Sequence, residues 1–199
     1  MTPPSTWKKI AIDLIGPYND KTGKPLSDAG YKYVLTFIDF FSNYTEAFPL
    51  YTKNASEIAE NLYTLFCRHG VPLEMISDNG GEFNSKLSGV IYDMYGYKHI
   101  KITPYNPQAN GKCERYNQTL KNMLNKTVKE ETNLWERFLP KCLFSYNTSK
   151  HSSTNFSPFY LMYWRNPLLP NEQSIGNTVN TFQSYEELNQ GQIEDCAIK

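Results

Sequence analysis

The sequence lacks the features that mark several classes of protein. No apolar run approaches the roughly 20 residues that a membrane-spanning helix requires. The opening stretch, MTPPSTWKK, contains no apolar signal-peptide core. The four cysteines are scattered without a CxxC pair, and the three histidines are too dispersed to build a zinc finger with them. We therefore expect a chain of the cytosol or nucleus that has no zinc finger.

Net charge is also absent. Twenty Lys and Arg residues balance 20 Asp and Glu residues, which argues against a dedicated nucleic-acid-binding module. The acids are concentrated at the end, however. Residues 171–199 hold five acids and one lysine, so residues 1–170 keep 19 basic and 15 acidic residues, a net charge of +4. We interpret residues 1–170 as one mildly basic folded domain and residues 171–199 as a polar, acidic tail or linker.

What the sequence does contain is a succession of strand and helix patterns. A chain of 199 residues with 40% hydrophobic residues is long enough for one sizeable core. Three strand patterns come first, and strands and helices then alternate, which predicts an α/β fold with a five-stranded mixed sheet flanked by helices. The expected strands are Lys8–Ile15, Tyr31–Asp39, Tyr44–Leu50, Leu73–Ser77 and Lys98–Thr103. The expected helices run from an Asn54/Glu57 capping pattern to Arg68, from Asn84 or Ser85 to Gly96, and over Lys112–Glu130, Leu134–Tyr146 and Ser157–Tyr163.

Three acidic residues lie where a purely structural role does not explain them. Asp13 interrupts the apolar strand pattern KKIAIDLIGP, and burying an unpaired carboxylate there costs several kcal/mol, on the order measured for uncompensated charges. Asp78 ends a second apolar stretch in ISDNGGEF, where a strand should leave the sheet in a tight turn. Glu114 follows 35 residues later, one turn into a helix in PYNPQANGKCERYNQTLK. A bound divalent cation would offset the cost at Asp13.

These acids, their spacing and the sequences around them resemble those of the catalytic core of retroviral and retrotransposon integrases. That family carries a D,D-35-E triad on a ribonuclease H-like fold, and the resemblance extends from about Trp7 to Pro170. The segment YNTSKHSSTNFSPFYLMYWRNPLLP resembles the closing segment of the Ty3/gypsy subgroup, which usually has Tyr-Gly where this chain has Tyr163-Trp164. The resemblance implies a metal-dependent polynucleotidyl transferase with endonuclease activity that processes DNA 3′ ends and transfers them to target DNA.

The resemblance also implies roles for individual residues. Asp13, Asp78 and Glu114 would be the catalytic metal ligands for two Mg²⁺ ions, for which Mn²⁺ can substitute. Asp13 would bridge the ions, with Asp78 completing one ion and Glu114 the other. The DNA partners would be the element ends and the target duplex, and the chain would be a homodimer that acts in the nucleus after cytoplasmic assembly.

The helix after Pro104–Gly111 carries the remaining candidate residues. Glu114, Asn117, Gln118 and Lys121 recur at i, i+3, i+4 and i+7 and are expected to share one stripe, although such a stripe can simply be the solvated side of an amphipathic helix. By resemblance, Lys121 would bind the DNA backbone and Asn117 would support the ligands or contact substrate. The substrate-binding set expected from the resemblance is Tyr105, Gln108, Asn110, Asn117, Gln118 and Lys121.

Two alternatives remain open from the sequence. The chain could be a domesticated integrase-derived module that binds DNA or protein without transposition. It could also be a ribonuclease H-type nuclease, which shares the fold and the metals. The sequence motifs around Glu82 and Tyr105 do not support this alternative.

Overall fold

The computed structural model describes residues 5–78, 80–81, 83, 86–101, 107–128 and 132–168. Its centre is a five-stranded sheet with the strand order β3-β2-β1-β4-β5. β1 pairs antiparallel with β2 and parallel with β4, so the sheet is mixed, as the sequence predicts. The strands are β1 (Lys9–Ile15), β2 (Tyr33–Asp39), β3 (Thr45–Leu50), β4 (Glu74–Ser77) and β5 (Lys98–Lys101).

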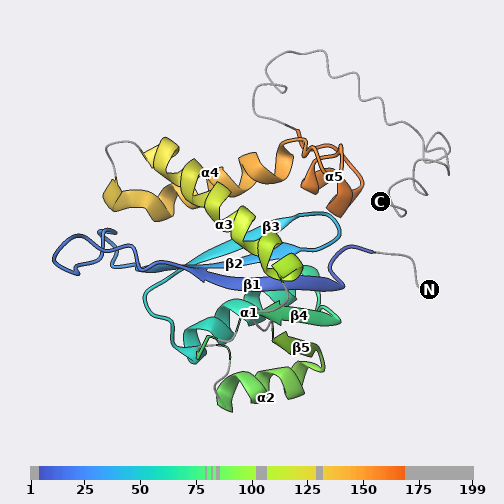
Figure 1. Ribbon diagram of the computed structural model, residues 1–199, viewed down its shortest axis with the longest axis horizontal. Helices are drawn as coiled ribbons and strands as arrows, with labels where there is room; N and C mark the ends of the chain where they lie inside the picture. Colours follow the sequence, from blue (N-terminus) through green and yellow to red (C-terminus); the bar gives the residue numbers. More distant parts are fainter. Residues whose placement is uncertain are drawn as a thin grey trace.

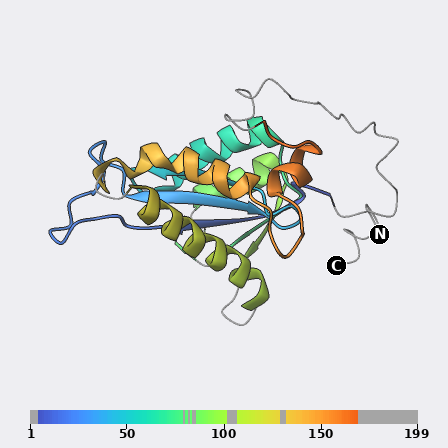
Figure 2. The same cartoon turned by 90° about the horizontal axis from the view of Figure 1, so that it is seen from above.

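Helices cover both faces of the sheet (Figures 1 and 2). One layer holds α1 and α2, and the other holds α3 and α4, with α5 packed against α4. The helices are α1 (Ala55–His69), α2 (Lys86–Tyr95), α3 (Pro107–Val128), α4 (Trp135–Thr148) and α5 (Pro158–Tyr163), with a 3-10 turn at Thr132–Leu134. In the part of the chain that the structure describes, no helix is long and apolar enough to cross a membrane.

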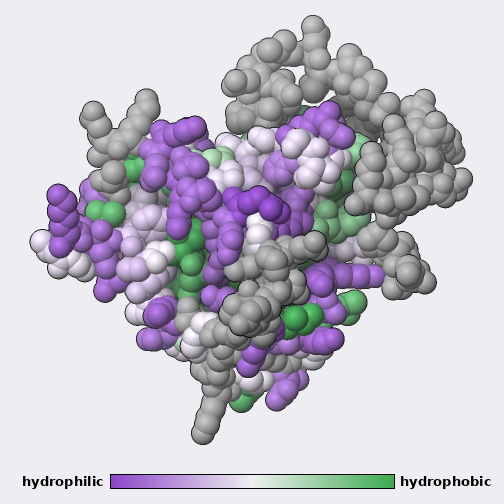
Figure 3. Space-filling model, viewed as in Figure 1, coloured by the Kyte–Doolittle hydropathy of each residue, from purple (hydrophilic) through white to green (hydrophobic). Residues whose placement is uncertain are grey.

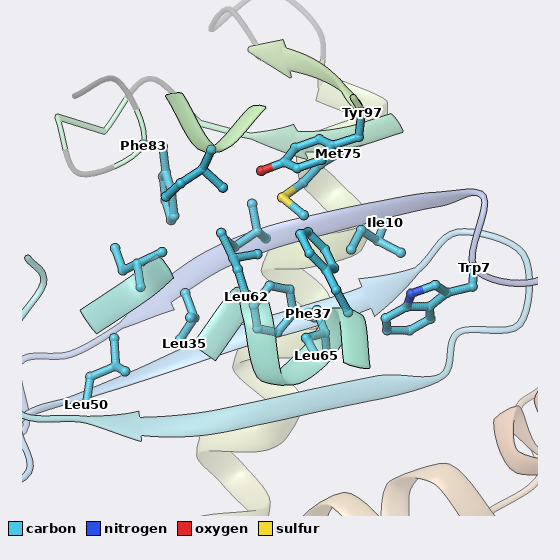
Figure 4. Packing of buried hydrophobic residues seen from close by; sticks show 14 of the residues in the cluster. Trp7, Ile10, Leu35, Phe37, Leu50, Leu62, Leu65, Met75, Phe83 and Tyr97 are labelled. Carbon is cyan, nitrogen blue, oxygen red and sulfur yellow. The ribbon is translucent and has the colours of Figure 1, made fainter. Parts of the chain in front are cut away.

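Strand β1 lies between two hydrophobic cores because its residues alternate between the faces of the sheet. Ile10 and Ile12 face the α1 core, in which Leu62 and Leu65 of α1 pack against the sheet (Figure 4). Ala11 and Ile15 face the second core, which is built with α3 and α4. This confirms the predicted alternation and gives β1, the central strand of the sheet, apolar contacts on both faces.

Two local expectations were wrong. Helix α3 begins at Pro107 rather than Lys112, because proline is well tolerated at the first helical position and a helix can continue through Gly111. The Asn54 side chain makes no capping hydrogen bond. The carboxylate of Glu57 instead accepts the backbone N–H groups of Tyr51 and Thr52, both at 2.8 Å. Residues 84–85, 102–106 and 171–199 lie outside the described residues, and so do the predicted helix cap, the end of the fifth strand and the acidic tail.

The closing helix α5 begins as its sequence predicts. Ser157 is the N-cap, its hydroxyl accepts the Tyr160 N–H at 3.1 Å, and a proline follows it. The helix ends at Trp164, whose φ of 54° is in the left-handed region. The resembled subgroup usually has glycine at that position, and the left-handed backbone that Trp164 adopts is one that favours glycine.

Candidate active site

Two of the three acids lie on neighbouring parallel strands, Asp13 within β1 and Asp78 directly after the end of β4. Ala11 of β1 pairs with Ile76 of β4, and Asp13 and Asp78 each follow two residues later in the sequence. The Gly80 N–H donates to Asp78 Oδ1 at 2.9 Å, and the Phe83 N–H donates to the Gly80 carbonyl at 3.0 Å, so the predicted tight turn follows Asp78. Carboxyl ends of adjacent parallel strands are where open α/β sheets place their ligands.

The Asp13 carboxylate is held by two hydrogen bonds. The Leu14 N–H donates to Oδ1 at 2.8 Å, and Asn117 Nδ2 donates to Oδ2 at 2.7 Å. Burial chiefly, together with the negative charges of Asp78 and Glu114, nevertheless raises the pKa of Asp13 from 3.8 to about 6, against the lowering effect of the two hydrogen bonds. The three acids therefore lie close enough to affect one another electrostatically.

Helix α3 supplies the third acid and the residues around it. Glu114, Gln118 and Lys121 are exposed, and the face of the molecule that carries α3 is largely hydrophilic (Figure 3). Gln118 Nε2 donates to Asn122 Oδ1 at 3.1 Å. Asn117 is only 7% exposed and turns inward to reach Asp13, so it does not share the solvated side of the helix, and this contact fits the expectation that it supports a ligand.

The remaining predicted contact residues are not placed in full. Tyr105 lies outside the described residues. Gln108 and Asn110 lie in the first turn of α3 rather than in a loop, and their side chains are outside what the structure describes.

Two residues near the acids were missed by the sequence reasoning. Thr36 lies directly opposite Asp13 in the β1–β2 register, and its hydroxyl donates to Asn117 Oδ1 at 3.0 Å. Cys113 is 3% exposed; burial first, and then the charges of the three acids, raise the pKa of its thiol well above its usual range. The thiol therefore stays protonated at neutral pH and is not an activated nucleophile. A polar residue at the centre of the apolar strand YVLTFID is the signal that could have identified Thr36.

The donor set fits a hard divalent cation in its chemistry. Mg²⁺ prefers carboxylate oxygens, and a partly buried carboxylate beside two others is stabilised when a cation offsets their repulsion. Among the described residues, no three His, Cys, Asp or Glu side chains form a group that could hold a metal ion. The charges of Asp78 and Glu114 therefore act on Asp13, but in the described part of the chain the three carboxylates do not form one coordination shell.

Comparison with known proteins gives relatives in sequence. No protein-family model matches the chain. The chain is similar to the protein named Gypsy retrotransposon integrase-like protein 1 of Rattus norvegicus, with 29% identity over 163 residues, which is 82% of this chain and 30% of that protein. The Mus musculus protein of the same name is 28% identical over 87% of this chain and 33% of its own length. The chain thus spans about a third of the length of these relatives.

Solved structures share the fold. The HTLV-2 integrase catalytic core domain in complex with magnesium superimposes with a TM-score of 0.65 at 21% identity, over 81% of this chain and 99% of that one. A chain of the simian T-cell lymphotropic virus intasome, solved in complex with the PP2A regulatory subunit B56 gamma, gives a TM-score of 0.68 at 21% identity over 85% of this chain and 61% of that one. The fold is therefore the ribonuclease H-like fold of retroviral integrase cores. The relatives in sequence and the neighbours in fold together support an integrase core domain of the gypsy retrotransposon kind, as the residue pattern predicted.

Proposed function

We propose that this chain is the catalytic core of an integrase, a metal-dependent polynucleotidyl transferase that processes DNA 3′ ends and joins them to target DNA. One observation carries the proposal. Asp13 within β1 lies beside Asp78, which directly follows the parallel strand β4, and burial first, then the charges of Asp78 and Glu114, raises the pKa of Asp13. A partly buried carboxylate beside other carboxylates suits a divalent-metal phosphoryl-transfer site.

In this proposal the three acids hold two Mg²⁺ ions. When bound, the ions would supply activation of a water or 3′-hydroxyl nucleophile and stabilisation of the leaving oxygen. Asp13, held on the central strand, Asp78 and Glu114 would be the residues that hold them. Two of the four acceptor positions on the Asp13 carboxylate already take hydrogen bonds, so its remaining lone pairs are available to cations.

The exposed side of α3 would then meet the DNA backbone. Lys121 lies two turns beyond Glu114 and is exposed, which suits a phosphate contact, and Gln118 lies one turn beyond Glu114. Contacts from Tyr105, Gln108 and Asn110 stay predictions, as does action in the nucleus. A net charge of zero gives the isolated chain few phosphate contacts, so we expect weak non-specific DNA affinity.

The test is turnover of a branched oligonucleotide by the chain with Mn²⁺. Asp13→Asn, Asp78→Asn and Glu114→Gln should each abolish cleavage and rejoining. Asp93→Asn on α2 and Glu60→Gln on α1 make the same chemical changes at exposed positions and should leave turnover intact. Near wild-type turnover in any one of the three site variants would remove that residue from the ligand set.

A domesticated binding module is the second candidate. One observation favours it: the curated relatives are mammalian proteins whose name says integrase-like. Such a module should bind DNA or a protein partner at sub-micromolar concentration with no cleavage that depends on Glu114. That pattern in the same assay would favour the module over the enzyme.

We also propose that the chain forms a homodimer. Of its structural neighbours, the HTLV-2 core has been solved in a dimeric and a trimeric form. Most apolar residues of α4 are used inside the chain, with Trp135, Leu139 and Cys142 buried in the core that includes α3. Phe144 remains 41% exposed beside a hollow of about 230 Å³ between β3, α4 and α5, so this part of α4 is the candidate contact.

A further inference from the structure

Thr36 is a buried polar residue beside Asp13, and the proposed function gives it no role. It is 0% exposed, and its neighbours on the same face of β2, Val34 and Ile38, are apolar core residues. A hydroxyl in such a place is costly unless it is hydrogen-bonded. Its partners therefore show what it does.

The register of the sheet places Thr36 beside Asp13. The two residues are directly paired across β1 and β2, so their side chains leave the same face of the sheet, and this is the face that α3 covers. Asn117 of α3 lies between them. Thr36 Oγ1 donates to Asn117 Oδ1 at 3.0 Å, and Asn117 Nδ2 donates to Asp13 Oδ2 at 2.7 Å.

This chain of hydrogen bonds fixes the orientation of the Asn117 amide. The amide has one acceptor end and one donor end, and an ionised carboxylate can only accept. The Thr36 hydroxyl occupies the acceptor end, which directs Nδ2 at the carboxylate. The same hydroxyl lies 3.2 Å from the Asp13 carbonyl oxygen, a second acceptor with which Asn117 Oδ1, at the shorter distance, shares its single proton.

Without the hydroxyl, Asn117 Oδ1 would lose this donor. Asn117 is 7% exposed, so little water can replace the lost bond. The amide would then turn in search of a donor, and the Nδ2 bond that sets the plane of the Asp13 carboxylate would weaken. Residues that orient a metal ligand in this way affect metal affinity without touching the metal.

We propose that Thr36 is a positioning residue, which acts through Asn117 to hold the Asp13 carboxylate in the plane needed to bind a divalent cation. The proposal rests on the proposed metal-dependent function. It predicts that the Thr36 hydroxyl matters for metal affinity, although Thr36 is not itself a ligand.

The chain contains a matched control. Thr45 on β3 is 1% exposed, and its hydroxyl donates to Oδ1 of another buried asparagine, Asn147, at 3.2 Å. This pair lies two strands away from β1. Thr36→Val and Thr45→Val remove the same group from the same kind of pair, and only the first pair leads to Asp13. Thr36→Ser keeps the hydroxyl and is the rescue variant.

The experiment measures Mn²⁺ binding to the whole chain by calorimetry, without DNA. Thr36→Val should weaken Mn²⁺ affinity about tenfold, the lower end of the range for residues that support a metal ligand, whereas Thr36→Ser and Thr45→Val should bind as the wild type does. In the metal-free protein, the Asn117 side-chain amide protons should exchange with solvent faster in Thr36→Val than in Thr45→Val.

The outcomes separate the two ideas. Wild-type Mn²⁺ affinity in Thr36→Val, with binding still abolished by Asp13→Asn, would overturn the positioning role and leave the proposed function standing. Binding that does not depend on Asp13 in the wild type would overturn the proposed function and this inference with it. Equal weakening by Thr36→Val and Thr45→Val would show a general loss of stability and would also overturn the positioning role.

Discussion

Asp13→Asn should stabilise the metal-free protein at neutral pH. The pKa of Asp13 rises from 3.8 to about 6 on folding, chiefly because of burial. At about 1.36 kcal/mol per pKa unit, ionised Asp13 destabilises the fold by about 3 kcal/mol, or about 2 after allowance for its partial exposure. Asparagine offers one oxygen where aspartate offers two, so one of the hydrogen bonds from Leu14 and Asn117 is lost, at about 1 kcal/mol. The expected net gain is about 1 kcal/mol.

The sign of this effect should reverse with pH. A carboxyl group whose pKa is raised in the folded state destabilises the fold fully above the folded pKa of about 6, and not at all below the unfolded value of 3.8. Near pH 4 only the lost hydrogen bond of Asp13→Asn remains. The wild type should then be the more stable protein by about 1 kcal/mol.

The assay is thermal unfolding in EDTA at pH 7.5 and near pH 4. A gain of about 1 kcal/mol raises Tm by about 2–4 °C in a chain of this size. Added Mg²⁺ should stabilise the wild type more than the variant, because only the wild type keeps the full ligand set.

Asp39→Asn is the matched control. The Asp39 carboxylate is buried but accepts three donors, from the Trp7 N–H and from the N–H and hydroxyl of Ser42, so its replacement should lower Tm at pH 7.5. An unchanged or lower Tm for Asp13→Asn at pH 7.5, or a difference independent of pH, would refute the reasoning.

Three further changes test other parts of the molecule. Trp164→Gly should be about 1 kcal/mol more stable than Trp164→Ala in urea unfolding, because only glycine adopts the left-handed backbone there without strain. A more stable Trp164→Ala would contradict the left-handed conformation at this position. Lys121→Ala should reduce the slope of log K for DNA binding against log salt concentration by about one unit, whereas Lys126→Ala in the last turn of α3 should not. Equal slopes would show that Lys121 is a solvated surface residue that does not contact phosphate. Phe144→Glu should shift the light-scattering mass toward the 23.0 kDa of one chain, and Tyr63→Glu on α1 should not; a wild type that is already monomeric at high micromolar concentration would exclude the dimer.

The elements and the acid positions could be predicted because they depend on local signals. Hydrophobic alternation located β1, and an acid within it indicated Asp13. An apolar stretch followed by a glycine turn located Asp78. Helical periodicity placed Glu114, Gln118 and Lys121 on an exposed side of α3, which the structure confirms.

The contacts between elements could not be predicted in the same way. Thr36 opposes Asp13 only in one strand register, and the long connection between Ile15 and Tyr33 leaves that register undetermined by the sequence. Asn117 turns inward because two hydrogen-bonding partners from other strands meet it there. Asn54 is the N-cap of α1, but the hydrogen bonds expected of a capping box are absent for a related reason. The Glu57 carboxylate accepts the N–H groups of Tyr51 and Thr52 instead, and local sequence propensity does not reveal which donors it takes.

The hydrogen bond between Asn117 and Asp13 joins residues that are 104 positions apart in the chain. During synthesis, β1 emerges from the ribosome long before α3, and contacts of such sequence separation form only when the domain folds as a unit. A nascent or truncated chain that ends before α3 has Asp13 and Asp78 but neither Glu114 nor the amide that holds Asp13. On the proposed function such a chain cannot cut DNA. If the proposed function holds, the order of the elements along the gene delays any cleavage of DNA until the core is complete.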